Sequence, residues 1–295
     1  MPDSGLAAFW DELDQELARY PAAPELELLP LRSTELATAY GVRLTSLGPY
    51  RIFGYYSVPR GPGPFPGLLL TPRYGSVNHV PDYYDRERYA VLQVVHRGQR
   101  LADQPFAAAY PGLLTLGIDS PATYIYRGIA ADCLRGAEFL LSRPEVDPLR
   151  VGLEGDDLAL LTAARRPQFT ALLATGLLFY RLLEASQRTD VYPVQEVADY
   201  LRAFPERRAA VARTLAFWDP AHHAPRVRAR CLIPRGDAAA LDGSAWLAPL
   251  LQALGGPVAE LHLSHEGGTD HDRLDAWMAA QLGTAPRSRF RQRGA

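Results

Sequence analysis

Short apolar runs alternate with helical patterns from residue 67 to the end of the chain, and this alternation constrains the fold more than any other feature. The apolar runs, typical of strands buried on both faces, are 67–71, 89–95, 150–153, 170–178, 230–234 and 258–263. Helical patterns occupy 131–142 and 245–254, and another follows at 272–281. Strand–helix–strand units with right-handed crossovers build a mainly parallel sheet with helices on both faces. The sequence therefore predicts a single α/β domain over residues 1–295.

The segments outside this alternation are predicted to decorate that domain. An N-terminal helix falls within 1–30, where apolar residues recur at helical spacing until prolines end the pattern. Segments 40–47 and 50–58 alternate in polarity, which predicts an antiparallel pair of strands at the start of the sheet. Residues 180–218 are predicted to form a mostly polar helical insertion, and 286–295 a flexible basic tail.

Composition and charge exclude several functional classes. The formal net charge is −2, so nothing marks the chain as a binder of nucleic acid or of membrane surfaces. All 31 basic residues are arginine, which excludes a Schiff base or a general base built on lysine. Cys133 and Cys231 lie in apolar segments and are interpreted as structural thiols. Because we find no signal peptide or membrane span, we expect a cytoplasmic protein. No cofactor is predicted.

The stretch 150–164 has the pattern of a short strand, a tight turn at Gly155-Asp156-Asp157 and an Ala/Leu-rich helix. A sharp strand-to-helix turn presents one side chain above a sheet, beside the N–H groups of the helix N-terminus. Gly155 and Ala159 flank Asp157 at the spacing that such a turn requires. Asp157 is then either a nucleophile, which forms a covalent ester cleaved by a His-activated water, or a cap of the following helix.

Two residues further along the chain favour the nucleophile. Asp237 follows the predicted strand 230–234, at a position from which a carboxylate orients a histidine. His271 follows the last predicted strand, where a general base reaches the mouth of the sheet. The order of Asp157, Asp237 and His271 is the order of nucleophile, acid and histidine in α/β-hydrolases.

The segment around His271 has a rival interpretation as a metal site. Its potential ligands are His265, Glu266, Asp270, His271 and Asp272, five within eight residues. Their spacing matches no metal motif, and Gly267-Gly268 is typical of a loop hinge. A metal-dependent site at 265–272 is therefore kept only as an alternative, and no metal is predicted.

Arginine and tyrosine side chains between residues 73 and 127 are interpreted as structural. Arg97 and Gln99 follow a buried strand, and Arg127 precedes a helix. Arginine is seldom buried without a partner, and Asp132 is the nearest candidate. We expect a buried hydrogen-bond network of these four residues.

Several short motifs, spread from about residue 5 to about residue 285, carry a resemblance to a known family. They are Phe9-Trp10-Asp11, His96-Arg-Gly-Gln99, Gly117-Ile118, Thr123-Tyr-Ile-Tyr-Arg-Gly128 with Asp132, Glu145-Val-Asp-Pro-Leu-Arg-Val151, Ala216-Phe-Trp-Asp219 and Ala224-Pro-Arg-Val227. Together they resemble the acetyl xylan esterase / cephalosporin C deacetylase family. The Arg-Gly-Gln and Tyr-x-Tyr-Arg spacing is the more specific part of this resemblance.

The resemblance implies an α/β-hydrolase fold with a β-extension at its N-terminal edge. It also implies cytoplasmic deacetylation of small acetylated sugars or cephalosporins, by a homo-oligomer that is often a hexamer. The groups that stabilise the oxyanion in the family correspond here to the side chain of Tyr74 and the backbone N–H of Leu158. The family's acid and base fall on Asp237 and His271.

The chain departs from the family at the turn itself. The family sequence Gly-x-Ser-Gln-Gly-Gly corresponds here to Gly155-Asp156-Asp157-Leu158-Ala159-Leu160, so Asp157 replaces the serine and larger side chains replace the glycines. The family's Cys-Pro-Pro after its acid is also missing, since Ala238-Ala-Ala-Leu241 follows. A carboxylate that attacks an acetyl group leaves an anhydride. Asp nucleophiles suit displacement at sp³ carbon, as in the haloalkane dehalogenases and epoxide hydrolases of the same fold.

Three hypotheses follow from the sequence. The first is a hydrolase of a small ester or related substrate that works through Asp157, Asp237 and His271. The second is a catalytically inactive family member that binds a ligand or acts as a scaffold. The third is the metal-dependent site at 265–272.

Overall fold

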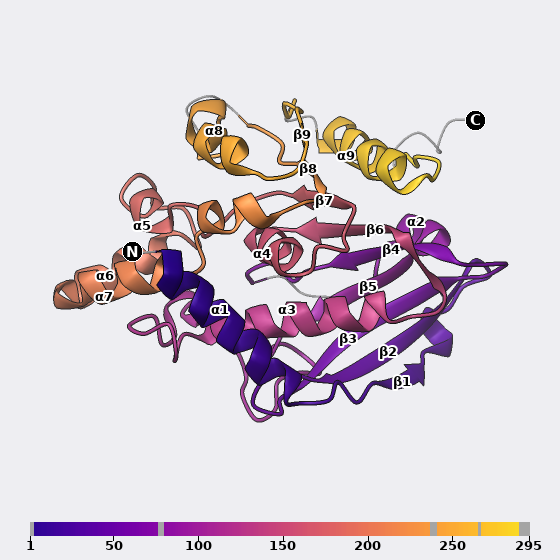
Figure 1. The fold of residues 1–295 in the computed structure, drawn as a ribbon, viewed down its shortest axis with the longest axis horizontal. Coiled ribbons are helices and arrows are strands. Elements are labelled where there is room, and N and C mark those ends of the chain that lie inside the picture. The colour runs from indigo at the N-terminus through magenta and orange to yellow at the C-terminus, as the bar shows by residue number, and fades with distance from the viewer. Residues whose placement is uncertain (1–2, 76–79, 237–240, 265–266, 289–295) are drawn as a thin grey trace.

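The computed structural model describes residues 3–75, 80–236, 241–264 and 267–288. In this part of the chain, strands form one sheet in the order β1-β2-β3-β5-β4-β6-β7-β8-β9 (Figure 1). Their bounds are β1 Glu25–Leu28, β2 Ala37–Thr45, β3 Arg51–Pro59, β4 Phe65–Leu70, β5 Ala90–Val95, β6 Val146–Gly155, β7 Ala171–Ala174, β8 Arg230–Leu232 and β9 Val258–Ala259. The pairs from β1 to β5 are antiparallel, and those from β5 through β4 to β9 are parallel. The sheet is thus mainly parallel with an antiparallel N-terminal extension, as predicted.

Helices cover both faces of the sheet. Their bounds are α1 Asp3–Ala18, α2 Tyr83–Arg88, α3 Ile125–Leu141, α4 Asp157–Arg165, α5 Leu182–Ala185, α6 Gln195–Ala203, α7 Arg208–Leu215, α8 Ser244–Ala253 and α9 Gly267–Leu282. Helices α3 and α4 pack on one face, and α1 crosses over α3 on the outside (Figure 1). Helix α9 packs on the other face, beside α2. Among the described residues, no helix has the length and apolar character needed to cross a bilayer.

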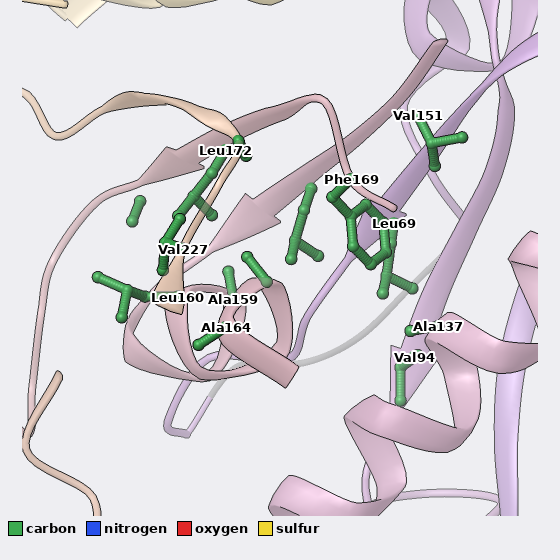
Figure 2. Packing of buried hydrophobic residues seen from close by; sticks show 14 of the residues in the cluster. Leu69, Val94, Ala137, Val151, Ala159, Leu160, Ala164, Phe169, Leu172 and Val227 are labelled. Atoms are coloured by element: carbon green, nitrogen blue, oxygen red, sulfur yellow. The ribbon is translucent and has the colours of Figure 1, made fainter. Parts of the chain in front are cut away.

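The core explains why the central strands are apolar on both sides. Successive strand residues point to opposite faces, so Leu69 packs toward α4 while its neighbour Leu68 packs toward α9. Figure 2 shows the α4 side, where Leu172 of the sheet lies near Leu160 of α4, and Leu69 lies beside Phe169. Burial on both faces fixes the register of these strands, and with it the position of each loop at their carboxyl ends.

The structure corrects several predicted boundaries. The segment 1–30 is not only helical, because it also contains β1, whose four residues are exposed and show no alternation. The last helix begins at Gly267 rather than at residue 272. Within the predicted tail, Arg287 pairs with Glu87 at 2.6 Å, and its backbone N–H donates to Asp275, so this residue contacts α2 and α9. The insertion 180–218 consists of α5, α6 and α7.

Both cysteines are buried thiols. Cys133 lies in α3 and Cys231 in β8, and neither side chain is exposed. Burial raises the pKa of both thiols, to about 12 for Cys231. They pack as small apolar side chains.

Candidate functional site

A cavity of about 920 Å³ opens at the carboxyl ends of the central parallel strands. The segments that leave β4, β6, β7 and β8 form part of its wall, together with the start of α8. The wall is mostly apolar, and its charged side chains are Arg73, Asp156, Arg181, Arg188 and Asp242. Open α/β sheets bind their ligands in this crevice, which makes the cavity the candidate site.

The turn between β6 and α4 is an ordinary capped helix start. A Cβ atom at Gly155 would lie 1.9 Å from Oγ1 of Thr71, so only glycine fits where β6 ends beside β4. Asp156 follows with φ −114° and ψ −143°, and its Oδ1 accepts the N–H of Leu158 at 2.9 Å. Neither Asp156 nor Asp157 has a positive φ. The strained turn that presents a nucleophile in α/β-hydrolases is therefore not formed here.

The carboxylate of Asp157 points into the protein rather than into the cavity. Its side chain is buried, and Oδ2 accepts the backbone N–H groups of Leu178 and of Phe179, the latter at 3.0 Å. Its Oδ1 atom is buried and has no hydrogen-bond partner among the residues that the structure describes. Burial, and then the nearby charge of Asp156, raise the pKa of Asp157 well above its ordinary value. Asp157 thus attaches the segment after β7 to the start of α4.

Asp156, by contrast, lies on the cavity wall. Burial raises the pKa of its carboxyl group to about 6, although the N–H of Leu158 and the positive charge of Arg73 act in the opposite direction. A carboxyl group with this pKa changes its protonation state close to neutral pH. Perturbed titratable groups in a cavity are typical of functional sites.

Both groups expected to stabilise an oxyanion are already engaged. The hydroxyl of Tyr74 donates to Oε1 of Glu196 at 2.5 Å and accepts the N–H of Leu114 at 3.2 Å. Burial and the bond to Glu196 raise the pKa of Tyr74 far above its ordinary value. The N–H of Leu158 donates to Asp156. An oxyanion in the cavity would have to displace both acceptors.

The predicted base lies apart from the cavity that Asp156 lines, and the predicted acid cannot be placed. Asp237 lies outside the described residues. His271 lies within α9 rather than in a loop before it, and it lines a separate cavity of about 200 Å³ with Leu68 and Met278 on the α9 side of the sheet. The hydrogen bonds of Asp157 go to Leu178 and Phe179 and not to His271. The helix begins earlier than predicted, and this places His271 in α9 rather than in the loop before it.

The predicted structural network divides into three parts. Arg97 pairs with the fully buried Asp132, whose Oδ1 lies 2.7 Å from Nη2 and whose Oδ2 lies 3.0 Å from Nε. Gln99 instead donates to Tyr110 at 3.5 Å. Arg127 does not join Asp132, because its guanidinium pairs with Glu16 of α1 at 2.5 Å.

The described residues contain no group of three or more side chains placed to hold a metal ion. Asp270, one of the candidate ligands, accepts the backbone N–H and the hydroxyl of Ser264 at 2.8 Å and 2.9 Å. His265 and Glu266 lie outside the described residues.

Sequence reasoning missed Asp156, Arg73 and the aromatic wall of the cavity. Trp246 of α8 contacts Arg181, whose guanidinium carbon lies 4.0 Å from the ring centroid. Arg181 has a left-handed backbone conformation with φ 52°. The adjacent residues Asp156 and Asp157 could have indicated this arrangement, because either aspartate can serve as the N-cap of the helix.

The mixed sheet, its antiparallel edge, the flanking helices and the cavity at the carboxyl ends of the strands together define a protein of the α/β-hydrolase fold. A family model described as Acetyl xylan esterase (AXE1) matches residues 2–239. The chain belongs to this family.

Solved structures agree with this assignment. The acetyl xylan esterase from Paenibacillus sp. R4 matches with a TM-score of 0.80 and 25% identity, over 94% of each chain. Acetyl Xylan Esterase 1 from Thermoanaerobacterium sp. JW/SL YS485 shares the fold with a TM-score of 0.77 and 19% identity, over 94% of this chain and 93% of that one.

A curated relative is the acetyl esterase Axe7A of Xylanibacter ruminicola. It is 25% identical over 184 residues, which are 57% of this chain and 42% of that protein. The matched region thus spans less than half the length of this relative.

Proposed function

We propose that the chain binds a small ester or related acyl compound in the cavity and does not process it through a covalent enzyme intermediate. One observation carries this proposal: Asp157, at the position of the family's serine, is buried and accepts the N–H groups of Leu178 and Phe179. An attack by Asp157 on a ligand would require both hydrogen bonds to break. The two backbone donors would then be left buried and unsatisfied.

The engaged oxyanion groups support the same proposal. Acyl transfer needs hydrogen-bond donors aimed at the developing negative charge. The hydroxyl proton of Tyr74 is directed at Glu196, and the N–H of Leu158 at Asp156. A covalent pathway of the serine-esterase type would therefore lack its electrostatic stabilisation.

The size of the cavity and the names of the relatives suggest the class of ligand. A volume of about 920 Å³ is within the usual range for small-molecule sites. The relatives are named as an acetyl esterase and acetyl xylan esterases. A small compound that carries an acyl group fits both observations.

Membership in an esterase family favours a second candidate function. In it, the chain is a hydrolase in which Asp157 attacks the substrate, Asp237 acts as the acid and His271 as the base. This function requires Asp157 to turn from Leu178 toward the cavity and His271 to leave the α9 side of the sheet.

Calorimetry with acetophenone, a non-hydrolysable acyl compound, tests the proposal. We expect binding by the wild type and loss of binding in Ala245→Trp, which fills the cavity from α8. Ala248→Trp, on the same helix but outside the cavity wall, is the matched control. Rapid mixing with p-nitrophenyl acetate should give no stoichiometric burst of nitrophenol. A burst that Asp157→Asn abolishes would establish the second candidate instead.

A further inference from the structure

We propose that Asp156 is the general base of the cavity and that, with Arg73, it promotes direct attack of water on a bound ester. This inference rests on the proposed binding function and adds an activity to it. In direct hydrolysis Asp156 removes a proton from the attacking water. In the covalent mechanism of the second candidate function Asp157 would instead bond to the substrate.

The geometry of Asp156 leaves one carboxylate oxygen for chemistry. Oδ1 accepts the N–H of Leu158, which fixes the orientation of the side chain. Oδ2 makes no hydrogen bond to any residue that the structure describes, although the whole residue is only 6% exposed. The side chain forms part of the cavity wall. A carboxylate oxygen of a cavity wall that has no protein donor is satisfied by water or by a ligand.

Arg73 supplies donors to the same part of the cavity. A guanidinium carries five N–H groups, and three of them point to the carbonyl oxygen of Thr175, to its hydroxyl and, at 3.5 Å, to the carbonyl of Gly155. These bonds fix the side chain across the ends of β6 and β7. Within the described part of the chain, its Nε–H and one Nη1–H have no acceptor. They are available to an oxygen that gains negative charge.

The reaction balances without a co-reactant other than water. Oδ2 of Asp156 takes a proton from water, and the water oxygen bonds to the acyl carbon of the ester. Arg73 stabilises the negative charge on the former carbonyl oxygen. The bond between the acyl carbon and the alcohol oxygen then breaks, and the alcohol oxygen takes the proton from Asp156. The products are a carboxylic acid and an alcohol, and Asp156 is again ionised.

The charged and titratable groups around Asp156 determine the pH at which it can act. Arg73 faces it from the segment after β4, Tyr126 and Cys133 from α3, and Asp157 from α4. Arg181, Arg188 and Asp242 line the same cavity. The pKa of Asp156, raised by burial to about 6, leaves the carboxylate ionised at neutral pH and still basic enough to accept a proton.

The variant Asp156→Asn isolates the base. Asparagine keeps an oxygen for the N–H of Leu158 and is an equally good N-cap, so the turn is retained. We expect kcat/KM for p-nitrophenyl acetate to fall by about 100-fold or more. In the wild type, kcat/KM should rise with pH through about 6 and then level off, and in the variant it should be flat. Asp82→Asn, which alters the N-cap of α2 away from this cavity, should leave both properties unchanged.

Two results would overturn the inference, and only the first of them is compatible with the proposed binding function. If the wild type binds acetophenone but hydrolyses the ester no faster than Asp156→Asn, the general base is wrong and the binding function stands. If acetophenone does not bind, the binding function fails as well. Asp156→Asn and Asp82→Asn must both unfold cooperatively, at a temperature no lower than that of the wild type by more than a few degrees.

Discussion

Oδ1 of Asp156 accepts the backbone N–H of Leu158 at 2.9 Å. This bond occupies the donor that the family resemblance assigns to the oxyanion. The acceptor is the side chain that precedes Asp157, the residue that the resemblance aligns with the family's serine. Asp156 therefore has two structural consequences. It caps α4, and it allows Asp157 to enter the helix and turn toward Leu178 and Phe179. The following predictions depend on this arrangement.

The substitution Asp157→Ser is expected not to create a serine esterase. The new hydroxyl would lie in the buried position of the carboxylate, whose hydrogen bonds go to Leu178 and Phe179, while His271 lines a separate cavity. Intact-mass spectrometry after treatment with a fluorophosphonate should show no labelled protein. Stoichiometric labelling would mean that the side chain at residue 157 reaches the cavity.

The substitution Asp157→Ala should destabilise the protein more than Asp157→Asn. Alanine leaves the N–H groups of Leu178 and Phe179 without their acceptor, at a cost of about 1–3 kcal/mol each. Asparagine retains an acceptor oxygen for these donors and removes the buried charge, so it should cost less than alanine. Urea unfolding at neutral pH measures both values. Equal losses for the two variants would show that these hydrogen bonds do not hold the segment after β7.

The stability difference between Asp156→Asn and the wild type should depend on pH. The folded-state pKa of Asp156 is raised from 3.8 to about 6, so the folded protein binds more protons than the unfolded chain between these values. The ionised carboxylate thus destabilises the fold above about pH 6, and this penalty disappears as the pH falls toward 4. A shift of roughly two units corresponds to about 3 kcal/mol. Asp156→Asn should gain free energy of unfolding at pH 8 and lose this gain near pH 4.

Urea unfolding of the two proteins at both pH values measures this effect. Taking the difference between them cancels the contributions of groups that do not interact with Asp156, such as the buried His96 and His223, whose pKa values burial lowers to about 4. A difference that does not change with pH would contradict the burial of an ionisable group at residue 156.

The buried pair of Arg97 and Asp132 should be required for stability. Asp132→Ala leaves the guanidinium of Arg97 and the hydroxyl of Ser46 without their carboxylate, and should cost about 3–5 kcal/mol. Asp199→Ala removes the exposed partner of Arg202 and should cost less than about 1 kcal/mol. Similar losses in urea unfolding for the two variants would contradict the structural role of the buried pair.

The fold was predictable because its central strands are buried on both faces and its helices have clear periodicity. Strand β1 escaped prediction because Glu25–Leu28 is exposed throughout and is held by its backbone bonds to β2. The start of α9 was also missed, since Gly267-Gly268 is typical of a loop and yet begins the helix.

The site was less predictable than the fold. The segment containing Asp157 was correctly expected to join a strand to a helix, but two adjacent aspartates compete for the cap. Backbone donors about twenty residues further along the chain, at Leu178 and Phe179, determine which of them is buried. No local pattern contains that information. The position of His271 depended in turn on the start of α9.

The absence of a covalent intermediate is tested most directly by a single-turnover reaction in ¹⁸O-labelled water, with excess protein over p-nitrophenyl acetate. Trypsin then releases the peptide Val151–Arg165, which contains both Asp156 and Asp157, and mass spectrometry measures its mass. Direct attack of water predicts that the released acetate carries the label and that the mass of the peptide is unchanged. A peptide that gains about 2 Da, with the label located at Asp157, would show a covalent intermediate and contradict direct attack of water on the ester.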